Sequence, residues 1–241
     1  MSGKEDVKLL PQKKDVKLLG SPVSPFAIRA RMALNMKGLS YQYIEQDLFI
    51  KSQLLRSSNP VYRKVPVLIH NGKPICESLI IIEYVDESFV TAAPSILPAD
   101  PFDRAIGRFW AAYIDNKMLP DWLGIMKASA TLEARLEMVK LSDAKMKRME
   151  DVFAKWSNGK HFFGGDSIGY LDLALGSFLF WFKTIHKMFG VDIINVDNTP
   201  SLAIWATRFM ETATAKEVAP EENRMVEHMK KVYGAAASSA L

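Results

Sequence analysis

The sequence is poor in the residues that build disulfides and metal sites. Its 241 residues include one cysteine, Cys76, and four histidines, at positions 70, 161, 186 and 228. A single thiol forms no internal disulfide, and histidines so far apart show no metal-ligand spacing. A disulfide-stabilised secreted scaffold is therefore excluded. No metal or bound cofactor is expected, and the lone cysteine favours the reducing cytoplasm.

Long hydrophobic runs and strong charge of one sign are also missing. The most apolar stretch, LDLALGSFLFWF at 171–182, is too short to span a membrane and contains Asp172. Residues 1–19 lack the apolar core of a signal peptide. The net charge is +4, and lysine and arginine are spread along the chain. We therefore expect no membrane anchor and no nucleic-acid partner.

The two ends of the chain differ from the rest. The segment DVKLL occurs at 6–10 and again at 15–19, and only the second copy runs directly into the turn GSPVSPF. The first copy thus has no core to join. Residues 234–241 are rich in alanine and serine, a composition that does not form a packed core. These features predict flexible tails at 1–14 and 234–241.

Strand and helix patterns alternate in the first ninety residues. In chain order they are a short buried strand ending at Gly20, a helix from Pro25, a strand within 41–46, a short polar helix over 52–57, two strands joined at Asn71-Gly72, and an apolar helix from Ser78. This order, βαβ-α-ββα, predicts a thioredoxin-like α/β domain over 15–90.

Residues 91–100 contain two prolines and no periodicity, which predicts a linker. Beyond it only helical patterns occur: from 101 to about 127, from about 131, over 170–186, from Pro200, and from Pro220 to about Tyr233. The run over 170–186 is apolar on all sides, so we expect it to be the central helix of a bundle. The second domain is therefore predicted to be all-α, over 101–233.

Ser24 precedes Pro25, and proline is favoured at the first position of a helix. This makes Ser24 the natural N-cap, whose side chain accepts a hydrogen bond from the helix backbone. A hydroxyl at a helix N-terminus can also donate to an anion, beside free N–H groups and the positive end of the helix dipole. A thiolate is such an anion. The position alone is consistent with capping only or with capping and anion binding.

Two other places carry groups that suit the ends of a peptide. Glu77 can hold an ammonium, and Ser78, at the start of a helix, can hold a carboxylate, although a capping serine beside a solvated glutamate would have the same sequence. Pro66 stands where thioredoxin-like folds place a cis peptide bond, which would leave Val65 free to pair with a peptide ligand. Lys51 by itself is typical of a surface lysine.

These residues and their neighbours together resemble the glutathione transferases, most closely the plant tau class. The motifs are SPF at 24–26, KS at 51–52, SNPVYRKVPVL at 58–68, PICESLIIIEYVDE at 74–87, RFWAAYIDNK at 108–117 and GYLDLALGSFLFWF at 169–182. The resemblance covers roughly positions 15–233. It implies a homodimeric enzyme that conjugates its co-substrate, reduced glutathione, to hydrophobic electrophiles in detoxification.

The resemblance also implies roles for single residues. Ser24 faces the glutathione sulfur, and Lys51 meets the glycyl carboxylate. Val65, before Pro66, pairs with the cysteinyl backbone. The γ-glutamyl end is held by Glu77 and Ser78.

A hydrophobic pocket for the electrophile is expected beside the sulfur. Its predicted residues are Phe26 and Leu48 from the first domain and Tyr113, Phe209, Trp110 and Trp181 from the helical domain. Each aromatic residue among them could equally belong to the ordinary core. Gly169 and Asp172, at the cap and third positions of the buried helix, are interpreted as folding residues.

Other functions on the same fold make different demands. A ligandin would carry hydrophobic anions without chemistry, and a structural relative would lose the polar set at Ser24, Lys51, Glu77 and Ser78. A thiol-disulfide oxidoreductase would need cysteine at position 24, which serine cannot replace in a mixed disulfide. Reduction of organic hydroperoxides by glutathione is compatible with the transferase as a side activity.

Overall fold

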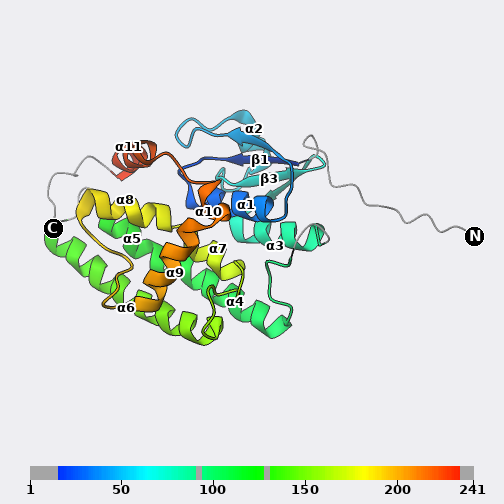
Figure 1. Cartoon of the computed structure of the whole chain (residues 1–241). Helices are drawn as coiled ribbons and strands as arrows, with labels where there is room; N and C mark the ends of the chain where they lie inside the picture. Colours follow the sequence, from blue (N-terminus) through cyan, green and yellow to red (C-terminus); the bar gives the residue numbers. More distant parts are fainter. Residues whose placement is uncertain (1–15, 91–93, 128–130, 234–241) are drawn as a thin grey trace, which may run out of the picture.

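A computed structural model describes residues 16–90, 94–127 and 131–233. The predicted tails at 1–14 and 234–241 lie outside these residues, as do residues 91–93 of the predicted linker. Figure 1 shows a sheet with its helices in the upper part of the molecule and a larger group of helices below it. The two parts follow one another along the chain.

A four-stranded sheet with the strand order β2-β1-β3-β4 forms the centre of the first domain. The strands are β1 (Val16–Gly20), β2 (Gln42–Glu45), β3 (Val67–His70) and β4 (Lys73–Cys76). β1 pairs in parallel with β2 and antiparallel with β3, and β3 pairs antiparallel with β4. The turn between β3 and β4 has positive φ at Asn71 and Gly72, as a two-residue hairpin of this hand requires.

Three helices complete the first domain. They are α1 (Pro25–Met36), α2 (Gln53–Ser58) and α3 (Ser78–Ser88). α1 and α3 pack against each other, and Ile28 of α1 and Ile82 of α3 share one buried core with Leu18 and Leu68 of the sheet. The observed element order confirms the prediction of a thioredoxin-like domain.

The helical domain begins with one long helical segment in which a π-helix separates two α-helices. α4 (Pro101–Tyr113) continues through a π-helical turn, η1 (Ile114–Met118), into α5 (Leu119–Met126). The sequence predicts a helix to about 127 but not the π turn within it. Pro120 gives a physical reason, because a proline has no N–H to continue the ordinary ladder of hydrogen bonds.

The remaining helices form the bundle predicted for this domain. They are α6 (Leu132–Ser157), α7 (Tyr170–Gly176), α8 (Leu179–Phe189), α9 (Pro200–Glu211), α10 (Ala213–Lys216) and α11 (Glu222–Tyr233). Thr131 caps α6 by accepting a hydrogen bond from the Ala134 N–H at 3.1 Å. The short helix α10 has no counterpart among the sequence predictions.

The prediction of one continuous helix over 170–186 is wrong, because α7 and α8 are separate helices. In a continuous helix the Ala174 carbonyl would accept a hydrogen bond from the Phe178 N–H. That N–H instead donates to the Leu175 carbonyl at 3.0 Å. The Ala174 carbonyl accepts two hydrogen bonds from the Arg29 guanidinium, at 2.6 and 3.1 Å. The Arg29 side chain of the first domain thus replaces the missing helical hydrogen bond to the Ala174 carbonyl, in the last turn of α7.

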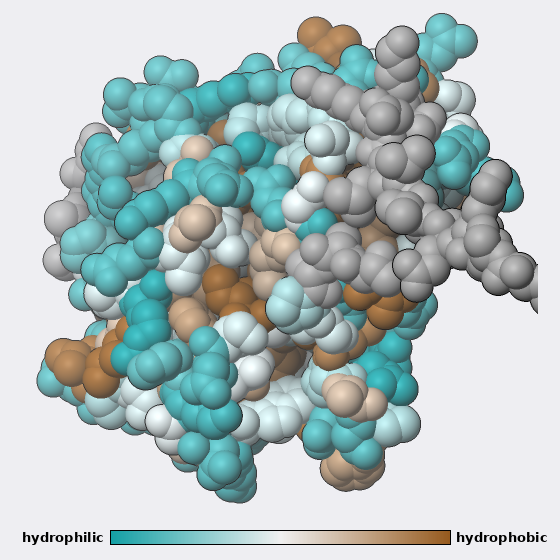
Figure 2. Space-filling view, turned by 45° about the vertical axis from the view of Figure 1, so that its right-hand side comes forward, coloured by the Kyte–Doolittle hydropathy of each residue, from teal (hydrophilic) through white to brown (hydrophobic). Residues whose placement is uncertain are grey.

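The surface of the molecule is mixed in character. Figure 2 shows a face that is hydrophilic over most of its area, with hydrophobic side chains gathered in a hollow near its middle. No helix among the described residues is both long and apolar enough to cross a bilayer. The described residues also contain no group of acidic, histidine or cysteine side chains that could hold a metal ion.

Candidate active site

Ser24 caps α1 as the sequence predicts. Its backbone is extended (φ −90°, ψ 117°), and its Oγ accepts a hydrogen bond from the Ala27 N–H at 3.3 Å. Pro25 occupies the first turn, and the Ser24 side chain is buried. Within the part of the chain that the structure describes, no acceptor takes the hydroxyl hydrogen of Ser24. Capping therefore leaves this donor available to a ligand.

A small cleft of about 110 Å³ lies beside the first turn of α1. It is lined by Phe26, Lys64, Val65, Pro66, Glu77 and Ser78. The Val65–Pro66 peptide bond is cis, as expected from its place in the sequence. The cleft therefore brings together the four residues at which the sequence predicts contacts to the cysteinyl and γ-glutamyl parts of a ligand.

Glu77 and Ser78 present different groups to this cleft. Glu77 has φ 71°, a left-handed conformation that is uncommon outside glycine and is maintained only by its surroundings. Its carboxylate is exposed and makes no capping hydrogen bond. Ser78 is buried at the start of α3, and its Oγ accepts a hydrogen bond from Arg29 Nη1 at 3.3 Å. Because the guanidinium donates to this oxygen, the Ser78 hydroxyl hydrogen is left for an anion in the cleft.

Arg29 is a site residue that the sequence analysis missed. It is fully buried, yet every part of its guanidinium has a partner. It makes two hydrogen bonds to the Asp115 carboxylate, at 2.7 and 2.8 Å, and one to Ser177 Oγ at 3.1 Å. The signal for it was a charge three residues after Phe26, on the face of α1 that is otherwise apolar.

The π turn η1 supplies the carboxylate that balances this buried charge. Asp115 lies within η1, and its side chain is 21% exposed, whereas that of Arg29 is 0% exposed. The pair joins α1 to the first rod of the helical domain. The cleft offers a carboxylate for an ammonium and a hydroxyl backed by a cation for a carboxylate. The free donor of Ser24 lies two residues before Phe26, which lines the cleft.

The two halves of the chain match the two domains of one known family. Residues 18–93 match the N-terminal domain of glutathione S-transferases, and residues 124–208 match their C-terminal domain. The chain belongs to the glutathione S-transferase family. Glutathione S-transferase U16 of Arabidopsis thaliana is 44% identical to it over 95% of this chain and 98% of that protein. The probable glutathione S-transferase GSTU6 of Oryza sativa is 46% identical over 86% and 89%.

Solved structures agree with this assignment. The tau class glutathione S-transferase of mango, Mangifera indica, superposes with a TM-score of 0.86 at 49% identity, over 92% of this chain and all of that one. A rice glutathione transferase solved in complex with glutathione superposes with a TM-score of 0.80 at 32% identity, over 92% and 99%. The protein is thus a tau class glutathione S-transferase.

A second cavity of this transferase, of about 430 Å³, lies near the loop that carries Ser24. Val23, directly before Ser24, lines this outer cavity, whereas Phe26, two residues after it, lines the cleft. The other lining residues are Ser21, Glu45, Gln46, Asp47, Leu48, Phe49, Arg224, His228 and Lys231. Ser24 itself lines neither cavity, but its neighbours in sequence line one each, and Leu48 belongs to the outer one.

The last helix of the transferase closes the outer cavity. On α11, His228 lies against the ring of Phe49 with centroids 6.1 Å apart, and the Lys231 ammonium is 4.0 Å from the centroid of the same ring. Arg224 forms an ion pair with Glu45. Burial lowers the pKa of His228, and the positive charges of Lys231 and Arg224 lower it further. The wall that α11 contributes is thus polar and basic.

The positions of two lysines in the first domain differ from those expected from the sequence. Lys51 is half-buried and lines neither the cleft nor the outer cavity among the described residues. Lys64, which the sequence analysis did not select, lines the cleft directly. The sequence could have identified Lys64 by its position immediately before Val65 and Pro66.

The remaining aromatic residues predicted for the electrophile pocket lie elsewhere in the transferase. Trp110 packs edge-to-face on Tyr113 at 5.4 Å and lines a separate groove of about 380 Å³ between α4 and α6. Phe209 is fully buried and packs against Trp205. Trp181 is 6% exposed and lies behind the loop that carries Ser24. Of the predicted set, Phe26 and Leu48 line cavities next to Ser24.

Asp172 organises the fold of the helical domain. It is fully buried and accepts hydrogen bonds from the N–H groups of Phe163, Gly164 and Gly169, and from the indole of Trp205. Burial raises the pKa of its carboxyl to about 6, against the opposing effect of these N–H donors. The bond from the Gly169 N–H to Asp172 is the half of a capping box that a glycine cap allows, and it belongs to folding and not to the site.

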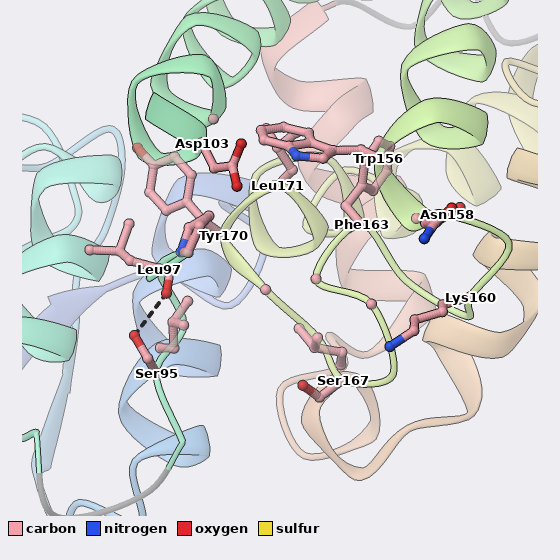
Figure 3. A pocket seen from close by; sticks show the side chains of 18 residues that line it. Ser95, Leu97, Asp103, Trp156, Asn158, Lys160, Phe163, Ser167, Tyr170 and Leu171 are labelled. Atoms are coloured by element: carbon pink, nitrogen blue, oxygen red, sulfur yellow. Dashed lines mark hydrogen bonds between the residues drawn. The ribbon is translucent and has the colours of Figure 1, made fainter. Parts of the chain in front are cut away.

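A further cavity, of about 330 Å³, lies between the end of the linker, α6 and the start of α7 (Figure 3). Three of its polar side chains have partners in the protein: Ser95 donates to the Leu97 carbonyl at 2.8 Å, and Lys160 pairs with Asp166 at 2.7 Å. Tyr170 donates to Glu83 at 3.2 Å. The cavity includes none of the predicted site residues.

Proposed function

We propose that this glutathione S-transferase conjugates the thiolate of reduced glutathione to hydrophobic electrophiles, and that Ser24 stabilises the thiolate. The observation that carries the proposal is the unused hydroxyl hydrogen of Ser24, in a segment where Val23 lines one cavity and Phe26 lines the other. A sulfur at this point would meet glutathione's own site on one side and a second substrate on the other.

The hydroxyl is of the right strength for this task. A free thiol has a pKa of about 8.5, and lowering it by about two units takes about 2.7 kcal/mol of preference for the charged form. One hydrogen bond to a charged group contributes about 1.5–3 kcal/mol. Donation from Ser24, together with the positive end of α1, is therefore sufficient to make thiolate the main species near neutral pH.

The polar residues of the cleft would hold the rest of glutathione. Glu77 faces the γ-glutamyl ammonium, and Ser78, backed by Arg29, faces the γ-glutamyl carboxylate. The cysteinyl backbone pairs with Val65, whose cis bond to Pro66 comes just before β3. Lys51 and Lys64 supply positive charge toward the glycyl carboxylate. The rice relative solved in complex with glutathione, at 32% identity, supports a glutathione site on this fold.

The chemical step needs no other reactant. The sulfur lone pair forms a bond to the electrophilic carbon, and the electron pair of the bond that breaks leaves with the departing group or moves onto the neighbouring atom. The thiol proton has already passed to solvent when the thiolate forms. Phe26, Leu48 and the outer cavity would hold the electrophile, whereas Tyr113, Trp110, Phe209 and Trp181 line neither the cleft nor the outer cavity among the described residues.

Turnover of a simple chlorinated nitroarene with glutathione tests the proposed activity. Conjugation produces the thioether and chloride in equal amounts, and the account predicts saturation by both substrates. Tight binding of hydrophobic anions without any turnover across a panel of electrophiles would instead identify a carrier protein.

The same proposal includes a homodimer in a reducing cytoplasm. Exposed hydrophobic side chains on the first domain and on α4 support pairing, among them Tyr62 (60% exposed), Ile80 (56%), Phe102 (70%) and Phe109 (59%). Light scattering at micromolar concentration should give twice the 27.1 kDa mass of the chain. A monomer mass under these conditions would contradict the dimer.

A further inference from the structure

The peptide bond that precedes Ser24 is held at both of its ends. Its N–H, on Ser24, donates to the Ser21 carbonyl at 3.1 Å, within the loop itself. Its carbonyl, on Val23, accepts a hydrogen bond from Trp181 Nε1 at 3.0 Å. The first bond is local, but the second comes from α8, 158 positions further along the chain. The orientation of this peptide plane sets the direction of the Ser24 Cα–Cβ bond, and hence of its hydroxyl.

The indole that donates to Val23 cannot easily move. Trp181 is 6% exposed. Its ring packs edge-to-face on Phe178, with centroids 5.9 Å apart, and on Tyr233 of α11, 6.3 Å apart. Phe178 in turn packs edge-to-face on Phe26 at 5.9 Å. The donor is therefore fixed by rings from α1, α8 and α11.

In a surface loop, water can hydrogen-bond to a carbonyl that has no protein donor. The Val23 carbonyl lies in a buried loop and depends on a donor from the protein. Val23 is 4% exposed, so its carbonyl without a donor would cost desolvation energy and the loop would rearrange to find another partner. A rearranged loop would change the direction of the Ser24 hydroxyl relative to the cleft that Phe26 lines. The contact thus does more than fill space, because it fixes the geometry of the one group proposed to act on the sulfur.

We propose that Trp181 is a positioning residue of the transferase: its indole N–H, bonded to the Val23 carbonyl, aims the Ser24 hydroxyl at the glutathione sulfur. The inference rests on the proposed role of Ser24. It gives the helical domain a part in activating the thiol, in addition to binding the electrophile.

Trp181→Phe is the direct test, because it keeps an aromatic ring and removes the N–H. The readout is the pKa of bound glutathione, from the ultraviolet absorbance of its thiolate in the full-length protein. The account predicts a rise of about half to one pKa unit relative to wild type. The rate at a pH below the wild-type pKa should fall about threefold to tenfold, while the KM for glutathione stays nearly constant because the cleft is intact.

Trp122→Phe is a matched control. Trp122 is also fully buried, packs on the same Phe178 at 4.9 Å, and donates its indole N–H to Ser142 at 3.1 Å. It has no bond to the Ser24 loop. Both variants lose one buried hydrogen bond and some packing, so both should lose thermal stability. Only Trp181→Phe should shift the pKa of bound glutathione.

The Ser24→Ala background separates this inference from the proposed function. There, adding Trp181→Phe should cause no further pKa shift, since there is no hydroxyl left to aim. If Ser24→Ala raises the pKa and Trp181→Phe does not, the positioning role alone is overturned. If Ser24→Ala leaves the pKa unchanged, both proposals fail. An equal shift in Trp122→Phe and Trp181→Phe also overturns the positioning role.

A second variant tests the same role of Trp181 if the Trp181→Phe protein does not fold. Replacing the indole of Trp181 by its benzothiophene analogue keeps the shape of the ring and substitutes sulfur for the N–H. The pKa of bound glutathione should rise as in the phenylalanine variant. A wild-type pKa in this protein would show that the N–H does not position Ser24.

Discussion

Arg29 and Asp115, from different domains, form a two-point ion pair with N···O distances of 2.7 and 2.8 Å at the back of the cleft. The guanidinium also reaches Ser78 Oγ at 3.3 Å. One buried cation therefore joins the domains, binds the Ala174 carbonyl near the end of α7, and supports the hydroxyl that is proposed to bind the γ-glutamyl carboxylate. Folding and ligand binding depend on the same side chain.

Asp115→Ala should be strongly destabilising. It leaves a fully buried guanidinium without its carboxylate, and breaking a buried pair in this way costs about 3–5 kcal/mol. The low end of that range applies, because 21% of the Asp115 side chain is exposed. Urea denaturation measures the loss. The KM for glutathione should rise as well, since Ser78 loses its fixed donor.

Arg108→Ala is the control for this prediction. Arg108 pairs with Glu83 at 2.7 Å and also connects α4 to α3, but its side chain is 44% exposed. Solvent-exposed pairs contribute about 0–1 kcal/mol. If Asp115→Ala were no more destabilising than Arg108→Ala, the structural role given to the Arg29 pair would be incorrect.

Glu77→Ala should weaken glutathione binding without changing the chemistry. The carboxylate is placed at the γ-glutamyl end, remote from the sulfur, so the KM for glutathione should rise about tenfold or more while kcat changes less. Steady-state kinetics with glutathione varied at saturating electrophile gives both constants. Glu87→Ala, an exposed glutamate on the same helix, should leave both unchanged. An unaltered KM in Glu77→Ala would remove this residue from the site.

Asp172 should make the stability of the transferase depend on pH in an unusual direction. Its pKa is raised to about 6 in the fold, above the ordinary value of 3.8, so the folded state binds more protons between these values. Stability contributed by this group is therefore present in full below pH 3.8 and is lost as the pH rises through 6. Relative to Asp172→Asn, which cannot titrate, the wild type should gain about 2–3 kcal/mol of unfolding free energy between pH 7 and pH 4.

Urea denaturation of both proteins across this range measures that difference. Taking it between the two proteins cancels the other acidic groups. A difference that stays constant with pH would show that the N–H donors around Asp172 outweigh its burial.

Local features of this protein were predictable from sequence, and distant contacts were not. The cap at Ser24 and the hairpin at Asn71 depend on a few adjacent residues, and the cis bond at Pro66 depends on the place of that proline in the thioredoxin-like order. All three appear as predicted. Arg29 has its partners 49 to 148 positions away, so no local pattern indicates them. For the same reason, the break between α7 and α8 was missed.

The candidate site divides in the same way. The motifs around Val65 and Glu77 indicated one cleft, and the structure places these residues on it. The predicted aromatic pocket depends on how helices pack, and the structure puts Phe209 in the core and Trp181 behind the Ser24 loop. Periodicity shows that a ring is buried but not which cavity it faces.

The central claim is that Ser24 activates the sulfur, beyond capping α1. Ser24→Ala removes both roles, and loss of the cap costs about 1 kcal/mol, so the variant should still fold. Ser21→Ala is the control: Ser21 is also buried, and its contact to Ser24 uses the backbone carbonyl, which the substitution keeps.

Titration of the bound glutathione thiolate by ultraviolet absorbance decides between the two roles. In wild type and Ser21→Ala the pKa should lie well below the free value of about 8.5. In Ser24→Ala it should rise toward that value, with a tenfold to hundredfold loss of rate at neutral pH that is largely recovered at alkaline pH, as expected for about 1.5–3 kcal/mol. The same thiolate pKa in wild type and Ser24→Ala would contradict the account.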